Sequence, residues 1–154
     1  MATRKRRIRQ YVAMGRSIND PAAVARVKGV RLDPPTQCRY CKAPVALINN
    51  AEIYGAEHGW PLTYACTHCS AKVGTHPGTD IPLGTLANRE TATARRLAHA
   101  ALDTLWQGKG TTARTLIYRS LAQAMGRPTV HISWLDAREC RRVVELAEMG
   151  ALSR

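Results

Sequence analysis

Two short motifs, Cys38-Arg39-Tyr40-Cys41 and Cys66-Thr67-His68-Cys69, decide the fold of this chain. Each is a Cys-x2-Cys pair, a spacing that lets one tight turn point two thiolates at the same metal ion. Two pairs supply the four sulfur ligands that a tetrahedral structural Zn²⁺ prefers. The pattern predicts one structural zinc ion, with no catalytic role, held by Cys38, Cys41, Cys66 and Cys69. Disulfide-bonded cysteines are the alternative, which the absence of secretory features disfavours.

The segment between the pairs, residues 42–65, is 24 residues long, which suits a β-hairpin that runs out and returns. Residues 43–48 are expected to leave the first pair as a strand, and residues 51–54 to continue it after a bend. Residues 55–59 are expected to turn, and residues 62–65 to return to the second pair. The sequence therefore predicts a zinc ribbon.

Positive charge is unevenly placed along the 154 residues, whose net charge is +12. Residues 1–42 hold 11 Lys/Arg and two Asp, whereas residues 43–154 hold 12 basic and nine acidic side chains. A basic segment of this kind is the electrostatic footprint expected of a protein whose partner carries phosphates. The alternative is a basic surface that serves only solubility.

The N-terminal segment 4–9 is a block of like charges, which is expected to be disordered alone and to order on an anionic partner. It is interpreted as an arm that contacts a nucleic-acid backbone, with a solvated tail as the alternative. Together with basic side chains near the ribbon, the predicted nucleic-acid-binding residues are Arg4, Lys5, Arg6, Arg7, Arg9, Arg39, Lys42 and Lys72.

Helical signals flank the ribbon. Asp20 and Pro21 are typical of a helix start and predict a short helix over residues 21–27. Residues 73–80 are expected to form a loop. Asn88 is then a good N-cap for a helix that ends at Trp106, with Leu97 in its apolar stripe.

Two more helices are expected further along. Thr112 is expected to cap the second helix, which ends at Gly126. His131-Ile132 is interpreted as a short extended piece. Ser133 and Asp136 resemble a capping box at the start of the third helix.

The predicted fold class is α+β, a zinc-ribbon β-hairpin module followed by a small three-helix module. The expected domains are residues 1–36, a basic disordered arm with a short helix, residues 37–80, the ribbon, and residues 81–154, the helical module.

Several motifs, in order, resemble a known family. The first is Tyr64-x-Cys66-x2-Cys69-x-Ala71-x-Val73-Gly74-x-His76-x2-Thr79-x2-Pro82-Leu83-Gly84-Thr85-Leu86-Ala87. The others are Arg95-Arg96-x-Ala98-His99-x2-Leu102-Asp103-x-Leu105-Trp106, Tyr118-x2-Leu121-Ala122 and His131-Ile132-x-Trp134-x-Asp136-x3-Cys140. Over about residues 38–146 the chain resembles a family of phage and prophage proteins described as containing a zinc finger. The resemblance implies a zinc-binding protein of viral origin.

Catalytic chemistry is the less favoured interpretation. His99 and Asp103 are four residues apart on one helical face and can pair, as a general base and its orienting carboxylate do. His76 and His131 are further candidates, and all four residues are equally compatible with structural roles. Cys140 on an apolar stripe is interpreted as a buried hydrophobe. A metal-dependent nuclease would need a His-rich metal centre, and its motifs are not evident in the sequence.

Aromatic and basic side chains suggest further contacts with nucleic acid. Trp60, near the hairpin turn, is the tryptophan expected to be exposed, where it would stack on unpaired bases. A phosphate-facing surface on the helices is a second hypothesis, with the residues Arg95, Arg96, Arg114, Arg119, Arg138, Arg141 and Arg142.

The favoured function is nucleic-acid binding, with DNA preferred to RNA, by a zinc protein that is not an enzyme. The rival is a protein-interaction module that docks on a host nucleic-acid enzyme such as RNA polymerase. No apolar run reaches the length of a membrane span and no signal-peptide core follows the N-terminus, so the expected location is the bacterial cytoplasm, with no membrane partner.

Overall fold

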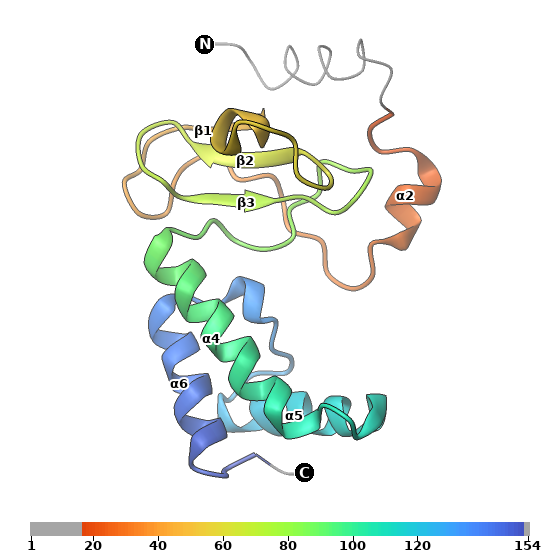
Figure 1. Cartoon of the computed structure of the whole chain (residues 1–154), viewed down its shortest axis with the longest axis vertical. Helices are drawn as coiled ribbons and strands as arrows, with labels where there is room; N and C mark the ends of the chain where they lie inside the picture. Colours follow the sequence, from red (N-terminus) through yellow and green to blue (C-terminus); the bar gives the residue numbers. More distant parts are fainter. Residues whose placement is uncertain (1–16, 153–154) are drawn as a thin grey trace. The chain divides into compact units, whose positions relative to one another are not determined.

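The computed structural model describes residues 17–152 (Figure 1). The predicted arm residues Arg4, Lys5, Arg6, Arg7 and Arg9 lie outside the described residues. The chain divides after Asn88 into two compact units. We call residues 17–88 the zinc unit and residues 89–152 the helical unit, and each is described by itself. The predicted α+β class is confirmed.

The zinc unit is built on a three-stranded antiparallel sheet with the order β1 (Val45–Asn49), β2 (Leu62–Cys66), β3 (Lys72–Gly74). β1 and β2 are the two predicted ribbon strands, and Val45 lies opposite Cys66 in their register. β3 was expected to belong to a loop. That prediction is wrong because Val73 pairs with Tyr64 of β2, in a strand too short to show an alternating pattern.

A helical turn, α3 (Ala51–Tyr54), replaces the predicted continuation of the first strand. The reason lies in Asn49 and Asn50, whose side chains bind nearby backbone, as asparagine does in turns. Asn49 Oδ1 accepts a hydrogen bond of 2.8 Å from Ala51 N, and Asn50 exchanges two hydrogen bonds with the backbone of His58. Gly55, in the left-handed conformation, ends the turn.

The predicted N-terminal helix is confirmed as α2 (Pro21–Arg26), and the Asp20 side chain caps it. The segment before it is fastened to the loop after β3. Asn19 and Asp80 exchange two hydrogen bonds of 3.0 Å, and Asn19 N donates to Gly78 O at 2.8 Å. The entry to α2 is therefore an integral part of the zinc unit.

Trp60 has a structural role in the zinc unit, which corrects the expectation that it is an exposed stacking surface. Its indole is partly buried against the core and donates to Thr75 Oγ1 at 2.9 Å and to Thr79 O at 2.8 Å. Tyr64, fully buried nearby, donates to Asp80 O at 2.7 Å. These hydrogen bonds join Trp60 and Tyr64 to residues 15 to 19 positions later in the sequence, so local sequence patterns do not reveal them.

The helical unit contains α4 (Arg89–Trp106), α5 (Gly110–Ala124), the 3₁₀ turn η1 (Ile132–Trp134) and α6 (Ala137–Glu148). The three predicted helices are confirmed, and their core is apolar, with the fully buried side chains Leu102, Ile117, Leu121, Leu135, Cys140 and Val143.

Two local predictions in this unit are wrong and one is correct in part. α5 begins at Gly110, ahead of the expected cap Thr112. In the predicted extended piece, His131 has an extended backbone but Ile132 begins a 3₁₀ turn. The capping box joins Asp136 to Glu139, because Asp136 is the residue with extended backbone and Glu139 stands three positions later.

Among residues 17–152, no helix combines the length and the apolar character needed to cross a membrane.

Candidate metal centre

The first cysteine pair forms a tight knuckle closed by backbone hydrogen bonds. Cys38 N donates to Ala43 O at 2.8 Å, and Lys42 N donates to Cys38 O at 3.0 Å. Lys42 adopts a φ of 66°, the left-handed conformation that favours glycine. The turn brings Cys41 back beside Cys38, so both thiols face the same side.

The second pair repeats this turn at the end of β2. Cys66 N donates to Ala71 O at 2.8 Å, and the backbone N–H groups of His68 and Cys69 point at Cys66 Sγ at 3.3 Å. Because Val45 lies opposite Cys66, the antiparallel register carries the two knuckles to the same end of the sheet.

The four sulfur atoms lie within 4.8 Å of one another. Cys38 Sγ is 3.6 Å from Cys69 Sγ, and Cys41 Sγ is 3.4 Å from Cys66 Sγ. A zinc ion with bonds of about 2.3 Å to four tetrahedral sulfurs would set them about 3.8 Å apart, whereas a disulfide requires about 2.05 Å. The geometry therefore fits one zinc ion and no disulfide, and all four cysteines are free.

Backbone donors stabilise the thiolate form of one cysteine in each knuckle. Burial raises the pKa of Cys66, but hydrogen bonds from backbone N–H groups within its knuckle and from neighbouring thiols lower that pKa to about 6. Burial likewise opposes ionisation of Cys38, and the backbone N–H groups of its own knuckle outweigh it, so its pKa is also lowered. Both knuckles are thus prepared to hold thiolates.

Cys69 shows why a cation is needed. A hydrogen bond from Ala71 N lowers its pKa, yet burial and the surrounding sulfur atoms raise it to about 12. Adding negative charge to a cluster that already holds thiolates is unfavourable without a metal. A Zn²⁺ ion supplies that charge, and four thiolate ligands leave no position open for substrate or water, which is the arrangement of a structural site.

Basic side chains lie on the first knuckle and on β3. Arg39 donates to Thr85 Oγ1 at 3.1 Å, and Lys42 Nζ donates to Arg39 O at 3.2 Å. Lys72 lies on β3, with its ammonium 6.0 Å from the ring centroid of Tyr54. These are the three described members of the predicted nucleic-acid-binding set.

The histidine candidates do not assemble a second centre. Among the described residues, the four cysteines form the one cluster of potential ligands with metal-binding geometry. His76 is half-buried and burial lowers its pKa. His99 is exposed and no hydrogen bond or ion pair within the described chain joins it to Asp103, while exposed His131 packs on Trp134 with ring centroids 4.5 Å apart.

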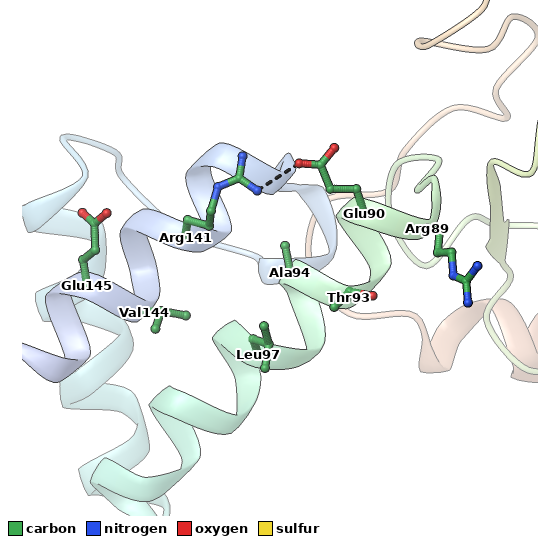
Figure 2. Close-up of a pocket in the computed structure, with 8 residues that line it drawn as sticks. All are labelled: Arg89, Glu90, Thr93, Ala94, Leu97, Arg141, Val144 and Glu145. Carbon is green, nitrogen blue, oxygen red and sulfur yellow. Dashed lines mark hydrogen bonds and ion pairs between the residues drawn. The ribbon is translucent and has the colours of Figure 1, made fainter.

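A groove between α4 and α6 was missed in the sequence (Figure 2). Leu97 was assigned to the buried stripe of its helix, but 55% of it is exposed. Figure 2 shows Leu97 and Val144 facing one hollow of about 790 Å³, with the Glu90–Arg141 ion pair of 3.0 Å at one end. The regular apolar periodicity of α4 does not indicate that the side of the helix carrying Leu97 is exposed.

Comparisons with known proteins support the metal centre. A family model described as a zinc-finger-containing domain matches residues 34–149. No curated protein and no solved structure matches the chain. The matched span includes all four cysteines and most of each unit, and the chain therefore belongs to this family of zinc-finger-containing domains.

Proposed function

We propose that this protein binds nucleic acid, with DNA preferred, through its basic N-terminal arm and the first knuckle, and that zinc holds these parts in place. The observation that carries the proposal is the distribution of charge. Residues 1–16 contain six Lys/Arg and no acidic residue. The knuckle-bearing segments 34–51 and 58–79 also contain no Asp or Glu. Phosphates are the partner that such a surface attracts.

The charge of the zinc centre enters this balance. Four thiolates and one Zn²⁺ carry a net charge of −2, so Arg39 and Lys42 offset the centre itself. Most of the free positive charge of residues 1–88 then belongs to the arm, residues 1–16, because residues 17–88 hold six Lys/Arg against five Asp/Glu. Asn19 is tied to Gly78 and Asp80, which fixes the point from which the arm extends. The arm is therefore expected to supply affinity, and the knuckle a smaller share.

The test is fluorescence anisotropy with labelled DNA across a salt series. Each lost phosphate contact lowers the slope of log K against log salt by about 0.9 on duplex DNA. Deleting residues 1–16 is expected to reduce that slope by several such steps, and Arg39→Gln with Lys42→Gln by less. Lys28→Gln, an exposed change outside the proposed surface, is the matched control. Absence of binding even at low salt would overturn the proposal.

The groove of the helical unit favours a second candidate, docking on a host nucleic-acid enzyme such as RNA polymerase. Its apolar floor between two helices, with arginine and glutamate on the rim, suits an amphipathic helix laid into the groove. The test is whether this protein retains purified RNA polymerase after nuclease treatment. Retention that is lost in the Leu97→Glu variant but kept in the Met149→Glu variant would support docking through the groove. Met149 is 72% exposed and lies outside the groove. Retention unaffected by Leu97→Glu would exclude the groove.

The resemblance to phage and prophage proteins leads us to propose a viral origin as well. Under that proposal the nucleic acid or the host enzyme is met in the cytoplasm of an infected bacterium. Detection of the protein in fractions of infected cells is the corresponding measurement.

A further inference from the structure

α5 lies in a long stretch of sequence without acidic residues. Residues 104–135 contain no Asp or Glu, although they include four basic residues, Lys109, Arg114, Arg119 and Arg127. The rest of the helical unit, by contrast, mixes acidic and basic residues and forms exposed ion pairs such as Arg142–Glu145 at 3.1 Å. α5 is thus the element of this unit whose own charge is entirely positive.

One face of α5 is polar and open to solvent. Ile117 and Leu121 are fully buried and hold the opposite face in the core. The exposed stripe follows the helical spacing i, i+3, i+4, i+7, i+11 and contains Thr112, Thr115, Leu116, Arg119 and Gln123. Thr, Arg and Gln are side chains that hydrogen-bond base edges, and an apolar side chain such as Leu116 suits a thymine methyl group.

The connection before α5 is that of a helix-turn-helix. Only residues 107–109 separate α4 from α5, and the turn includes Gly108 with a φ of 77°. Figure 1 shows α5 crossing α4 instead of running along it, while α6 packs beside α4. In such motifs the second helix enters the major groove and the first crosses the backbone.

The basic side chains of α5 are available to an anion. No carboxylate in the described part of the chain pairs with Arg119, which is exposed. Arg114 is held in place by aromatic rings, with its guanidinium 4.7 Å from the ring centroid of Tyr118 and 5.5 Å from that of Trp106. Stacking of this kind leaves the positive charge in place and orients the guanidinium in advance.

We infer that α5 is a DNA-reading helix that enters the major groove of duplex DNA, with Thr112, Arg119 and Gln123 toward the base edges and Arg114 toward a phosphate. This inference rests on the proposed nucleic-acid binding and names the element and the form of nucleic acid. The major groove of B-DNA, about 12 Å wide, admits a helix, whereas the deep, narrow groove of A-form RNA does not. Duplex DNA is therefore the occupant that fits.

The experiment compares short labelled duplex DNA, single-stranded DNA and duplex RNA of the same sequence, with the full-length zinc-loaded protein. Arg119→Gln is expected to weaken duplex DNA binding roughly tenfold, as the loss of one base contact does. Arg119→Glu is expected to weaken it further. Arg114→Gln, at the proposed phosphate contact, is expected to weaken binding roughly eightfold at about 0.1 M salt and to reduce the salt slope by about 0.9. Lys28→Gln, an exposed lysine of the zinc unit that lies outside both proposed surfaces, is the matched control and is expected to bind like the wild type.

The outcomes separate this inference from the function on which it rests. If Arg119→Glu binds duplex DNA as the wild type does while deletion of residues 1–16 abolishes binding, α5 is excluded and the arm remains. If Arg119→Glu weakens all three nucleic acids equally, α5 is a general cationic surface and the groove assignment is wrong. If the wild type binds none of them, both proposals fail. Circular dichroism and zinc content of each variant show that the fold is retained.

Discussion

Gly78 offers a sharp test of how the entry to α2 is fastened to the ribbon. Its φ is +76°, and a Cβ built on it would stand 2.7 Å from Ala23 Cβ. Ordinary van der Waals contact begins at 3.4 Å. Ala23 is buried on α2, so neither atom is the free end of a flexible side chain. Gly78→Ala must therefore push α2 away from the loop or distort that loop.

Two terms set the size of the effect. An alanine in the left-handed conformation costs roughly 1–2 kcal/mol, and overpacking a well-filled contact costs roughly 1–3 kcal/mol. We expect Gly78→Ala to lower the free energy of unfolding by about 3 kcal/mol. Gly59→Ala isolates the first term, because Gly59 has a φ of +55° and open space around its Cβ position. It should cost only about 1 kcal/mol.

Denaturant unfolding of the zinc-loaded protein measures both variants, with a tyrosine and tryptophan signal to which Trp60 and Tyr64 of the zinc unit contribute. A double-mutant cycle with Ala23→Gly completes the design, since removing the Ala23 Cβ removes the clash. In that background Gly78→Ala should cost about 2 kcal/mol less than in the wild type. If Gly78→Ala costs no more than Gly59→Ala, or if the cycle shows no coupling, α2 does not pack on this loop as described.

Three further predictions concern the metal centre and the helical unit. Chelation of zinc should unfold the zinc unit and leave the helicity of α4 to α6, which circular dichroism measures. The zinc affinity should also rise with pH, because Zn²⁺ must displace the proton of Cys69, whose pKa is raised to about 12. A competing chelator across a pH series measures that affinity, and a pH-independent value would contradict thiolate ligation. Lys42→Gly should stabilise the protein by up to about 1 kcal/mol, since its φ of 66° suits glycine, and a loss of stability would contradict this account of the knuckle. Asp136→Ala should cost about 1 kcal/mol by removing the capping box with Glu139, and thermal unfolding that matches the wild type would show that the box contributes nothing.

Sequence patterns succeeded where local chemistry determines structure. The spacing of the cysteines in each knuckle predicted the cluster, and the apolar periodicity predicted α4 and α6. They failed where tertiary contacts decide. Trp60 carries no sequence signal of its bonds to Thr75 and Thr79, and Leu97 matches the periodicity of a buried residue although its side of the helix is left open. The hydrogen-bonded turn at Asn50 similarly overrode the strand tendency of Ile53 and Tyr54.

The zinc centre and the basic arm are linked through one loop of the zinc unit. That loop, residues 76–81, accepts hydrogen bonds from Trp60 and Tyr64 of the ribbon and from Asn19 at the foot of the arm. The sheet that positions Tyr64 is the same sheet whose register brings the knuckles together.

Loss of zinc is therefore expected to affect nucleic-acid binding by geometry, since removing Zn²⁺ leaves every Lys and Arg in place. A freed arm keeps its own charge, so its salt slope should persist, while the charges of the knuckle and the arm no longer act together on one partner. The joint contribution of the arm and the knuckle to DNA affinity depends on the length and stiffness of the segment that links them. Metal-free protein should bind DNA more weakly with a smaller slope, because the contacts of the knuckle are lost while those of the arm and of α5 remain. Equal affinity with and without zinc would show that the knuckle contributes nothing to binding and that the metal centre serves only the stability of its own unit.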